Sequence, residues 1–239
     1  MRKNYLYNAM PFVAVLSILA MPIQAAQLIT NGGFEPDLSG WTRADQIGSD
    51  GSFLLQSGTS SPVIGDPVPS PPGPVNAAMT DAQGPGSHTM YQDFTVPGVV
   101  PSGSVSFMLF LNNQAAVYSV PNTLDFATPT LNQQFRVDII TTLADPFSVA
   151  PADVLQTIYK TTVGDPLTSG YTLVQADISA TLNAHLGQTL RLRFAEVDNV
   201  NIFHAGVDDV SINVVPEPGT LTTIAAALLG FIATCRRRK

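Results

Sequence analysis

Thr189-Leu190-Arg191-Leu192-Arg193-Phe194-Ala195-Glu196-Val197 is the stretch that decides the fold. Apolar residues at 190, 192 and 194 alternate with arginines, which is the pattern of a β-strand with one face in a core. Six more runs alternate or are rich in β-branched and aromatic residues: 88–96, 105–111, 134–142, 154–162, 171–178 and 205–214. Proline and glycine separate them, and only 180–186 suits a short helical turn. We therefore predict an all-β protein built as a two-sheet sandwich.

The N-terminus has the features of an export signal. Arg2 and Lys3 precede an apolar stretch over about 9–21, and the small residues Ala25 and Ala26 follow. A positive start, an apolar middle and a small-residue end are typical of a secretory signal peptide. We predict a signal helix within 1–26, cleaved after Ala25 or Ala26, and one mature domain over 27–214.

The predicted domain is acidic and has no cysteine. Five basic residues stand against 17 acidic ones over 27–214, a net charge of −12, and Cys235 of the tail is the single cysteine. This charge argues against binding to nucleic acid or to an anionic membrane surface, and it can attract Ca²⁺. An exported domain without disulfides must be held by its core, with or without a metal.

The last 25 residues form a three-part tail. Pro216-Glu217-Pro218 is followed by an uncharged apolar run over 221–235 and then by Arg236-Arg237-Arg238-Lys239. The run is shorter than the roughly 20 residues that span a bilayer comfortably, and the basic end should stay in the cytoplasm. We predict a transmembrane sorting helix here.

This tail, over 215–239, resembles the PEP-CTERM sorting signal of Gram-negative bacteria. The resemblance implies recognition, and cleavage, by an exosortase in cells that make exopolysaccharide. It also implies export to the cell envelope or the extracellular matrix, with the tail in the inner membrane before processing. The alternative is an ordinary, permanent C-terminal anchor.

Motifs at both ends of the predicted domain carry a second resemblance. Asn31-Gly32-Gly33-Phe34-Glu35 and Gly40-Trp41 open the domain, and the segments 186–194 and 207–212 close it. The pattern resembles the galactose-binding-like jelly roll that several carbohydrate-binding modules share. It implies a jelly-roll sandwich and leaves the ligand open, because this fold carries many functions.

Two segments of the domain suggest local structure. Asn31-Gly32-Gly33 permits a sharp turn with positive φ, after which Phe34 and Trp41 re-enter the core. The segment 58–76 holds six prolines, and proline cannot donate to a β-ladder. We predict an extended surface loop there, and a proline-rich ligand for a partner's groove is the alternative.

A calcium site is predicted from Glu35 and Asp208. In the last strand Asp208 shares a face with Val210 and Ile212, and a buried carboxylate needs a partner or a metal. Glu35 follows the first strand, which lies near the last strand in a jelly roll. We expect Glu35, Asp208 and a backbone carbonyl near Gly33 to bind one Ca²⁺, and modules with this resemblance hold a structural calcium at this position. The alternative is that Asp208 accepts backbone amide hydrogen bonds while Glu35 lies in solvent.

Catalytic motifs have little support in the sequence. His88, His185 and His204 lack paired zinc spacing, and we expect them at the surface or in loops. The domain contains neither a G-x-S-x-G elbow nor a phosphate-binding glycine loop. Two carboxylates suffice for glycoside hydrolysis, but the domain has only two glutamates, Glu35 and Glu196. We expect a protein that is not an enzyme.

The function predicted from the sequence is that of an exported, non-catalytic surface or extracellular-matrix protein. It associates with exopolysaccharide or binds glycans. Candidate sugar contacts are aromatic side chains and polar turns: Tyr118, Phe126, Tyr159, Phe203, and the segments 112–114 and 198–201. The alternatives are a structural or adhesive protein that binds other proteins and, second, a polysaccharide-acting enzyme.

Overall fold

The computed structural model describes residues 25–215. The predicted transmembrane sorting helix and the residues Pro216–Pro218 and Arg236–Arg238 lie outside this range, as does nearly all of the predicted signal helix. Within residues 25–215, no helix is long and apolar enough to cross a membrane.

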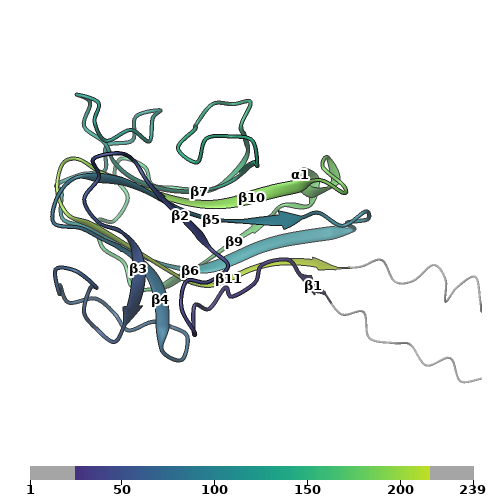
Figure 1. Ribbon diagram of the computed structural model, residues 1–239, viewed down its shortest axis with the longest axis horizontal. Helices are drawn as coiled ribbons and strands as arrows, with labels where there is room; N and C mark the ends of the chain where they lie inside the picture. The colour runs from purple at the N-terminus through teal and green to yellow at the C-terminus, as the bar shows by residue number, and fades with distance from the viewer. Residues whose placement is uncertain (1–24, 216–239) are drawn as a thin grey trace, which may run out of the picture.

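The described residues form a two-sheet antiparallel sandwich, as predicted (Figure 1). The first sheet has the order β3 (Ser52–Ser57), β4 (Asn76–Asp81), β11 (Phe203–Val215), β6 (Ser102–Asn113) and β9 (Thr172–Asp177), with β1 (Ala26–Gln27) paired to β11. The second has the order β2 (Thr42–Asp45), β5 (Gly86–Thr95), β10 (Thr189–Asp198), β7 (Gln133–Thr141) and β8 (Val154–Lys160).

The seven strands expected from the sequence are present, and the helical turn is α1 (Ser179–Asn183). The strands β2 to β4 were not predicted, whereas the first strand, expected before Asn31 and beside the last strand, is β1, which pairs with β11. The layers of Figure 1 show β5, β10 and β7 above β9, β6 and β11.

The core lies between the two sheets and follows the strand alternation. Leu190, Leu192 and Phe194 of β10 are buried in it. The ring of Phe107 from β6 meets Phe194 edge to face, with centroids 5.2 Å apart and planes at 89°, a favoured aromatic geometry. The ring of Trp41 also packs against Phe194, at 5.8 Å between centroids. The predicted burial of Trp41 is confirmed.

The turn at 31–34 differs in detail from the prediction. Positive φ occurs at Asn31 (50°) and Phe34 (53°), not at the glycines. Gly32 is required for another reason, because a Cβ at this position would collide with the carbonyl oxygen of Val210. Gly32 accepts a hydrogen bond from the Val210 amide at 2.9 Å. Close approach of the turn to β11, not backbone φ, therefore explains this glycine.

A β-bulge in β11 reverses the predicted direction of Asp208. The register with β6 shifts between Asp208 and Ser211, and Asp209 has φ of 50°. Val207 before the bulge and Val210 after it both lie in the core. Asp208 therefore lies on the outer face of the first sheet, and the prediction that it points into the core was wrong. It is buried all the same.

The proline-rich segment 58–76 is a loop that folds back on itself rather than running extended. Ser60 and Pro67 form an antiparallel bridge, and Val68 is buried against Met79 and Phe110 of the first sheet. The carboxylate of Asp81 accepts hydrogen bonds from backbone amides of this loop. The loop therefore covers the part of the first sheet's outer face that includes Met79, Phe110 and Asp208.

Candidate functional site

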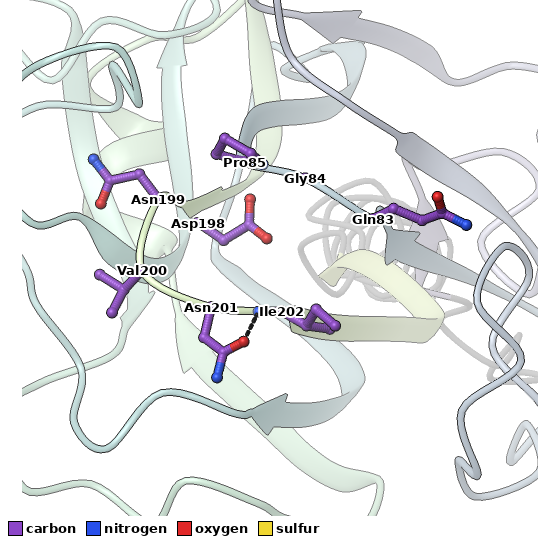
Figure 2. Close-up of a pocket in the computed structure, with 8 residues that line it drawn as sticks. All are labelled: Gln83, Gly84, Pro85, Asp198, Asn199, Val200, Asn201 and Ile202. Atoms are coloured by element: carbon purple, nitrogen blue, oxygen red, sulfur yellow. Dashed lines mark hydrogen bonds between the residues drawn. The ribbon is translucent and has the colours of Figure 1, made fainter.

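A pocket of about 290 Å³ lies at one end of the sandwich. Its walls are Gln83–Pro85, between β4 and β5, and Asp198–Ile202, which runs from the last residue of β10 to the start of β11. Both segments cross from one sheet to the other, so the pocket sits where the two layers join. Figure 2 shows the Asp198 carboxylate pointing into the space between these segments.

A buried group of three titratable side chains lies beside this pocket. His88 of β5 is directly opposite Glu196 of β10, and Gly86 is opposite Asp198. Because side chains alternate along a strand, the side chains of Glu196 and Asp198 lie on the same core-facing side of β10 as that of Phe194. One ligand atom each from His88, Glu196 and Asp198 lie within 4.8 Å of one another. We call these residues the buried triad; such a group could hold a metal ion.

The imidazole of His88 is oriented by a carboxylate. Its Nδ1 lies 2.8 Å from Oδ1 of Asp45 on β2. Since a carboxylate accepts, Nδ1 carries the proton of this hydrogen bond, and in a neutral ring Nε2 is then the acceptor nitrogen. Nε2 has no hydrogen-bond partner among the described residues. A Cβ at Gly86 would collide with this nitrogen, so glycine makes room for the ring.

The two carboxylates of the triad are poorly solvated. Burial raises the pKa of Glu196 well above its ordinary value, and the nearby charge of Asp198 adds to the shift. Burial also raises the pKa of Asp198 to about 8, although the amide of Gly86 donates to its Oδ1 at 2.8 Å and opposes the shift. Two such carboxylates are not readily ionised together without a cation.

The predicted calcium ligands are brought together on the opposite side of the first sheet. The amide of Gly73 donates to Asp208 Oδ2 at 2.8 Å, and the amide of Val75 donates to Glu35 Oε1 at 3.2 Å. Burial raises the pKa of Asp208 to about 6. The proximity of Glu35 to Asp208 follows the expectation from the sequence. Binding of Ca²⁺ there, and a role for the Gly33 carbonyl, stay predictions.

The aromatic candidates for sugar contact are packed inside the protein. Tyr118 and Phe203 are buried with their centroids 5.7 Å apart. Phe126 and Tyr159 are half-buried, against Leu124 and Phe135 respectively. No aromatic side chain within residues 25–215 is exposed. Of the sequence candidates, only the segment 198–201 lines the pocket.

The expectation that the histidines lie at the surface was wrong for two of them. His88 and His204 are buried in strands, and His185 is half-buried. The sequence did contain a signal for the triad. His88 is separated by an even number of residues from Met90 and Phe94, so it shares a strand face with these two residues, both of which are in the core. Alternation applied to polar residues, and not only to apolar ones, would have placed His88, Glu196 and Asp198 on inward faces.

The tail matches a known family model, whereas the rest of the chain has only distant structural likenesses. Residues 214–239 match the PEP-CTERM protein-sorting motif. The match includes Pro216-Glu217-Pro218 and Arg236-Arg237-Arg238, and it confirms the sorting motif predicted at the C-terminus. The motif indicates export and cell-surface sorting by an exosortase. No curated protein matches the chain in sequence.

Three solved structures illustrate the structural likeness. The K3 cleaved adhesin domain of Lys-gingipain from Porphyromonas gingivalis W83 is 11% identical, with 80% of this chain and 99% of that chain covered and a TM-score of 0.48. TmCBM61 in complex with β-1,4-galactotriose is 9% identical, with 78% and 97% covered and a TM-score of 0.47. An apo cyclase from Fischerella sp. is 15% identical, with 80% and 97% covered and a TM-score of 0.48. Such distant likeness carries no inference about ligand or activity.

Proposed function

We propose that this protein is a non-catalytic component of the cell surface or extracellular matrix of a Gram-negative bacterium and that it binds glycans, the producer's exopolysaccharide among them. The match of residues 214–239 to the sorting motif is the observation that carries the proposal. An exosortase is the proposed processing partner, and the tail would hold the chain in the inner membrane before processing. The resemblance of the domain's sequence to the galactose-binding-like jelly roll supports the proposal that the protein binds glycans.

The pocket at the end of the sandwich is the proposed glycan site. The side-chain amide of Asn199 donates to the carbonyls of Phe126 and Thr130, both at 3.0 Å, and the side-chain amide of Asn201 donates to the carbonyl of Gln114 at 2.8 Å. These bonds fix the turn between β10 and β11, which favours a pre-formed site. A volume of about 290 Å³ lies at the small end of ligand pockets. It suits one sugar ring or a chain end.

The burial of the triad supports a non-catalytic role. Glycoside hydrolysis needs two carboxylates at the scissile bond. Only Asp198 of the triad lines the pocket, whereas Glu196 and His88 are each 1% exposed. A polymer in the pocket would not reach Glu196.

An adhesive, protein-binding role is the second candidate. The proline-rich loop is held against the first sheet by hydrogen bonds to Asp81 and Asp208. It presents Val63, which is 46% exposed. A fixed proline-rich surface loses little conformational entropy when a partner binds it.

The sorting proposal is tested by mass spectrometry of the protein from its native host. We expect a new N-terminus at Ala26 or Gln27 and a C-terminus near Pro218, in the surface or matrix fraction. Deleting the exosortase, or replacing Pro216-Glu217-Pro218 by three alanines, should leave Lys239 intact in the membrane fraction. An intact Lys239 in the unmodified host would instead indicate a permanent anchor.

The glycan proposal is tested by retention on the producer's own exopolysaccharide and on a panel of other polysaccharides. Gln83→Ala, in the pocket wall, should weaken retention severalfold, while Gln188→Ala, at an exposed position just before β10, should not. No retention on any polysaccharide, together with specific binding of a host surface protein, would favour the adhesive role. Release of reducing ends would show an enzyme.

A further inference from the structure

We propose that His88, Glu196 and Asp198 form a binding site for one divalent transition-metal ion, with Zn²⁺ as the fitting member of that class. The site is distinct from the predicted calcium site at Glu35 and Asp208. It does not depend on glycan binding, because it is argued from the triad's own contacts.

Two orphaned acceptors inside the triad point to a cation. Nε2 of His88 and Oε1 of Glu196 are buried, and neither has a hydrogen-bond partner among the described residues. Buried polar atoms without partners are uncommon and costly. An imidazole lone pair and a carboxylate oxygen cannot satisfy each other without a proton between them. A metal ion would satisfy both, and Asp198 as well.

Asp45 completes the arrangement that metal-binding histidines need. A histidine ligand usually donates its second ring N–H to a carboxylate, which fixes the ring and raises its basicity. Asp45 Oδ1 stands 2.8 Å from His88 Nδ1, so Nε2 is the nitrogen left for the ion. Gly86 leaves space beside Nε2, where any larger residue would collide with the ring.

The chemical types of the three ligands favour one class of metal ion. Imidazole suits Zn²⁺ and its transition-metal neighbours, whereas Ca²⁺ requires six to eight oxygens. Tetrahedral Zn²⁺ with bonds of about 2.0–2.2 Å places its ligand atoms roughly 3.3–3.6 Å apart. The triad atoms lie within 4.8 Å of one another, so side-chain adjustments on the order of 1 Å would close the site.

The pocket provides the entry path. Asp198 is the triad member that lines the pocket and points into it (Figure 2). An ion reaching Asp198 from solvent would find Glu196 and His88 behind it. Three protein ligands leave a fourth position for water from the pocket.

The test uses the full chain, purified in mild detergent, stripped with EDTA and titrated with ZnCl₂ by calorimetry. CoCl₂ is titrated in parallel, because its visible spectrum reports the ligand geometry. We expect one ion per chain and a rise in Tm. Glu196→Gln and Asp198→Asn should each weaken binding at least tenfold, and Asp45→Asn should weaken it about 10–100-fold.

The double variant Glu35→Gln with Asp208→Asn is the matched control, and it should bind Zn²⁺ like the unaltered chain. A change in the ¹⁵N shift of His88 Nε2 on metal addition would identify the ligand atom directly, even if one variant fails to fold. The proposal is overturned if the folded, stripped chain binds neither ion at millimolar concentration. It is equally overturned if Glu196→Gln and Asp198→Asn bind as tightly as the unaltered chain.

Discussion

The amide of Gly73 donates a hydrogen bond to Asp208 Oδ2 at 2.8 Å, joining the proline-rich loop to β11 across 135 residues of sequence. Asp208 Oδ1 accepts a second bond, from the amide of Asp209 at 2.7 Å. One buried carboxylate thus fixes both the loop and the β-bulge.

Replacing Asp208 by alanine should therefore destabilise the protein and loosen the loop. Two backbone amides lose their acceptor, which costs about 1–3 kcal/mol in the free energy of unfolding. We expect faster proteolysis within 58–75 and a lower urea midpoint. Asp37→Ala, at an exposed position, is the control. Equal proteolysis of both variants would show that Asp208 does not hold the loop.

Calcium should raise the melting temperature if Glu35 and Asp208 bind it. An ion that binds only the folded chain adds stability in proportion to the logarithm of its concentration. The expected result is a fall in Tm on adding EGTA and its recovery with excess Ca²⁺. The double variant Glu35→Gln with Asp208→Asn should show neither change. A midpoint that EGTA leaves unaltered in the unmodified chain would argue against the site.

Neighbouring glycines provide a matched pair of substitutions. A Cβ at Gly32 would collide with the carbonyl oxygen of Val210, whereas at Gly33 the nearest atom, Asp209 Oδ1, would be 3.9 Å away. We expect Gly32→Ala to lower the free energy of unfolding by about 1–3 kcal/mol. Gly33→Ala should have little effect. Denaturant unfolding of both variants checks this, and similar values would contradict the close approach of the turn to β11.

Asp138 should support stability above acidic pH. It lies buried on the outer face of the second sheet, and Arg136 Nη2 is 2.6 Å from its Oδ1. Burial acts to raise the pKa of Asp138, but the guanidinium groups of Arg136 and Arg193 outweigh burial and hold this pKa below its ordinary value. The ionised form is therefore favoured in the folded state.

A depressed pKa contributes stability that is fully present above the unfolded pKa of about 3.9 and is lost as pH falls through the folded value. Asp138→Asn should cost about 3–5 kcal/mol at neutral pH, because Arg193 keeps a buried charge without its partner. The variant should also lose less stability than the unmodified chain as the pH falls below 4. Urea midpoints between pH 2 and 7 measure both effects. If the stability of the variant and that of the unmodified chain fell equally steeply below pH 4, the role given to Asp138 would be contradicted.

Strand prediction succeeded where one face meets the core and the other meets solvent or a loop. The alternation of β10 is an example. It failed for β4, whose six residues are all buried and whose two faces each mix apolar and polar residues, so that no alternation is visible in the sequence. β3 and β4 flank the proline-rich loop, and its prolines conceal the pairing of the two strands in the sequence.

The amino-acid sequence by itself determined the sorting tail and the class of fold, because each depends on local order: consecutive motifs in the tail and a period of two in the strands. Strand alternation could have placed the triad residues on inward faces, but only the tertiary structure brought them together and set the direction of Asp208. The triad depends on the register of β5 against β10, which places His88 opposite Glu196. The direction of Asp208 depends on one bulge in β11. Both are set by pairing between distant segments, which no local pattern specifies.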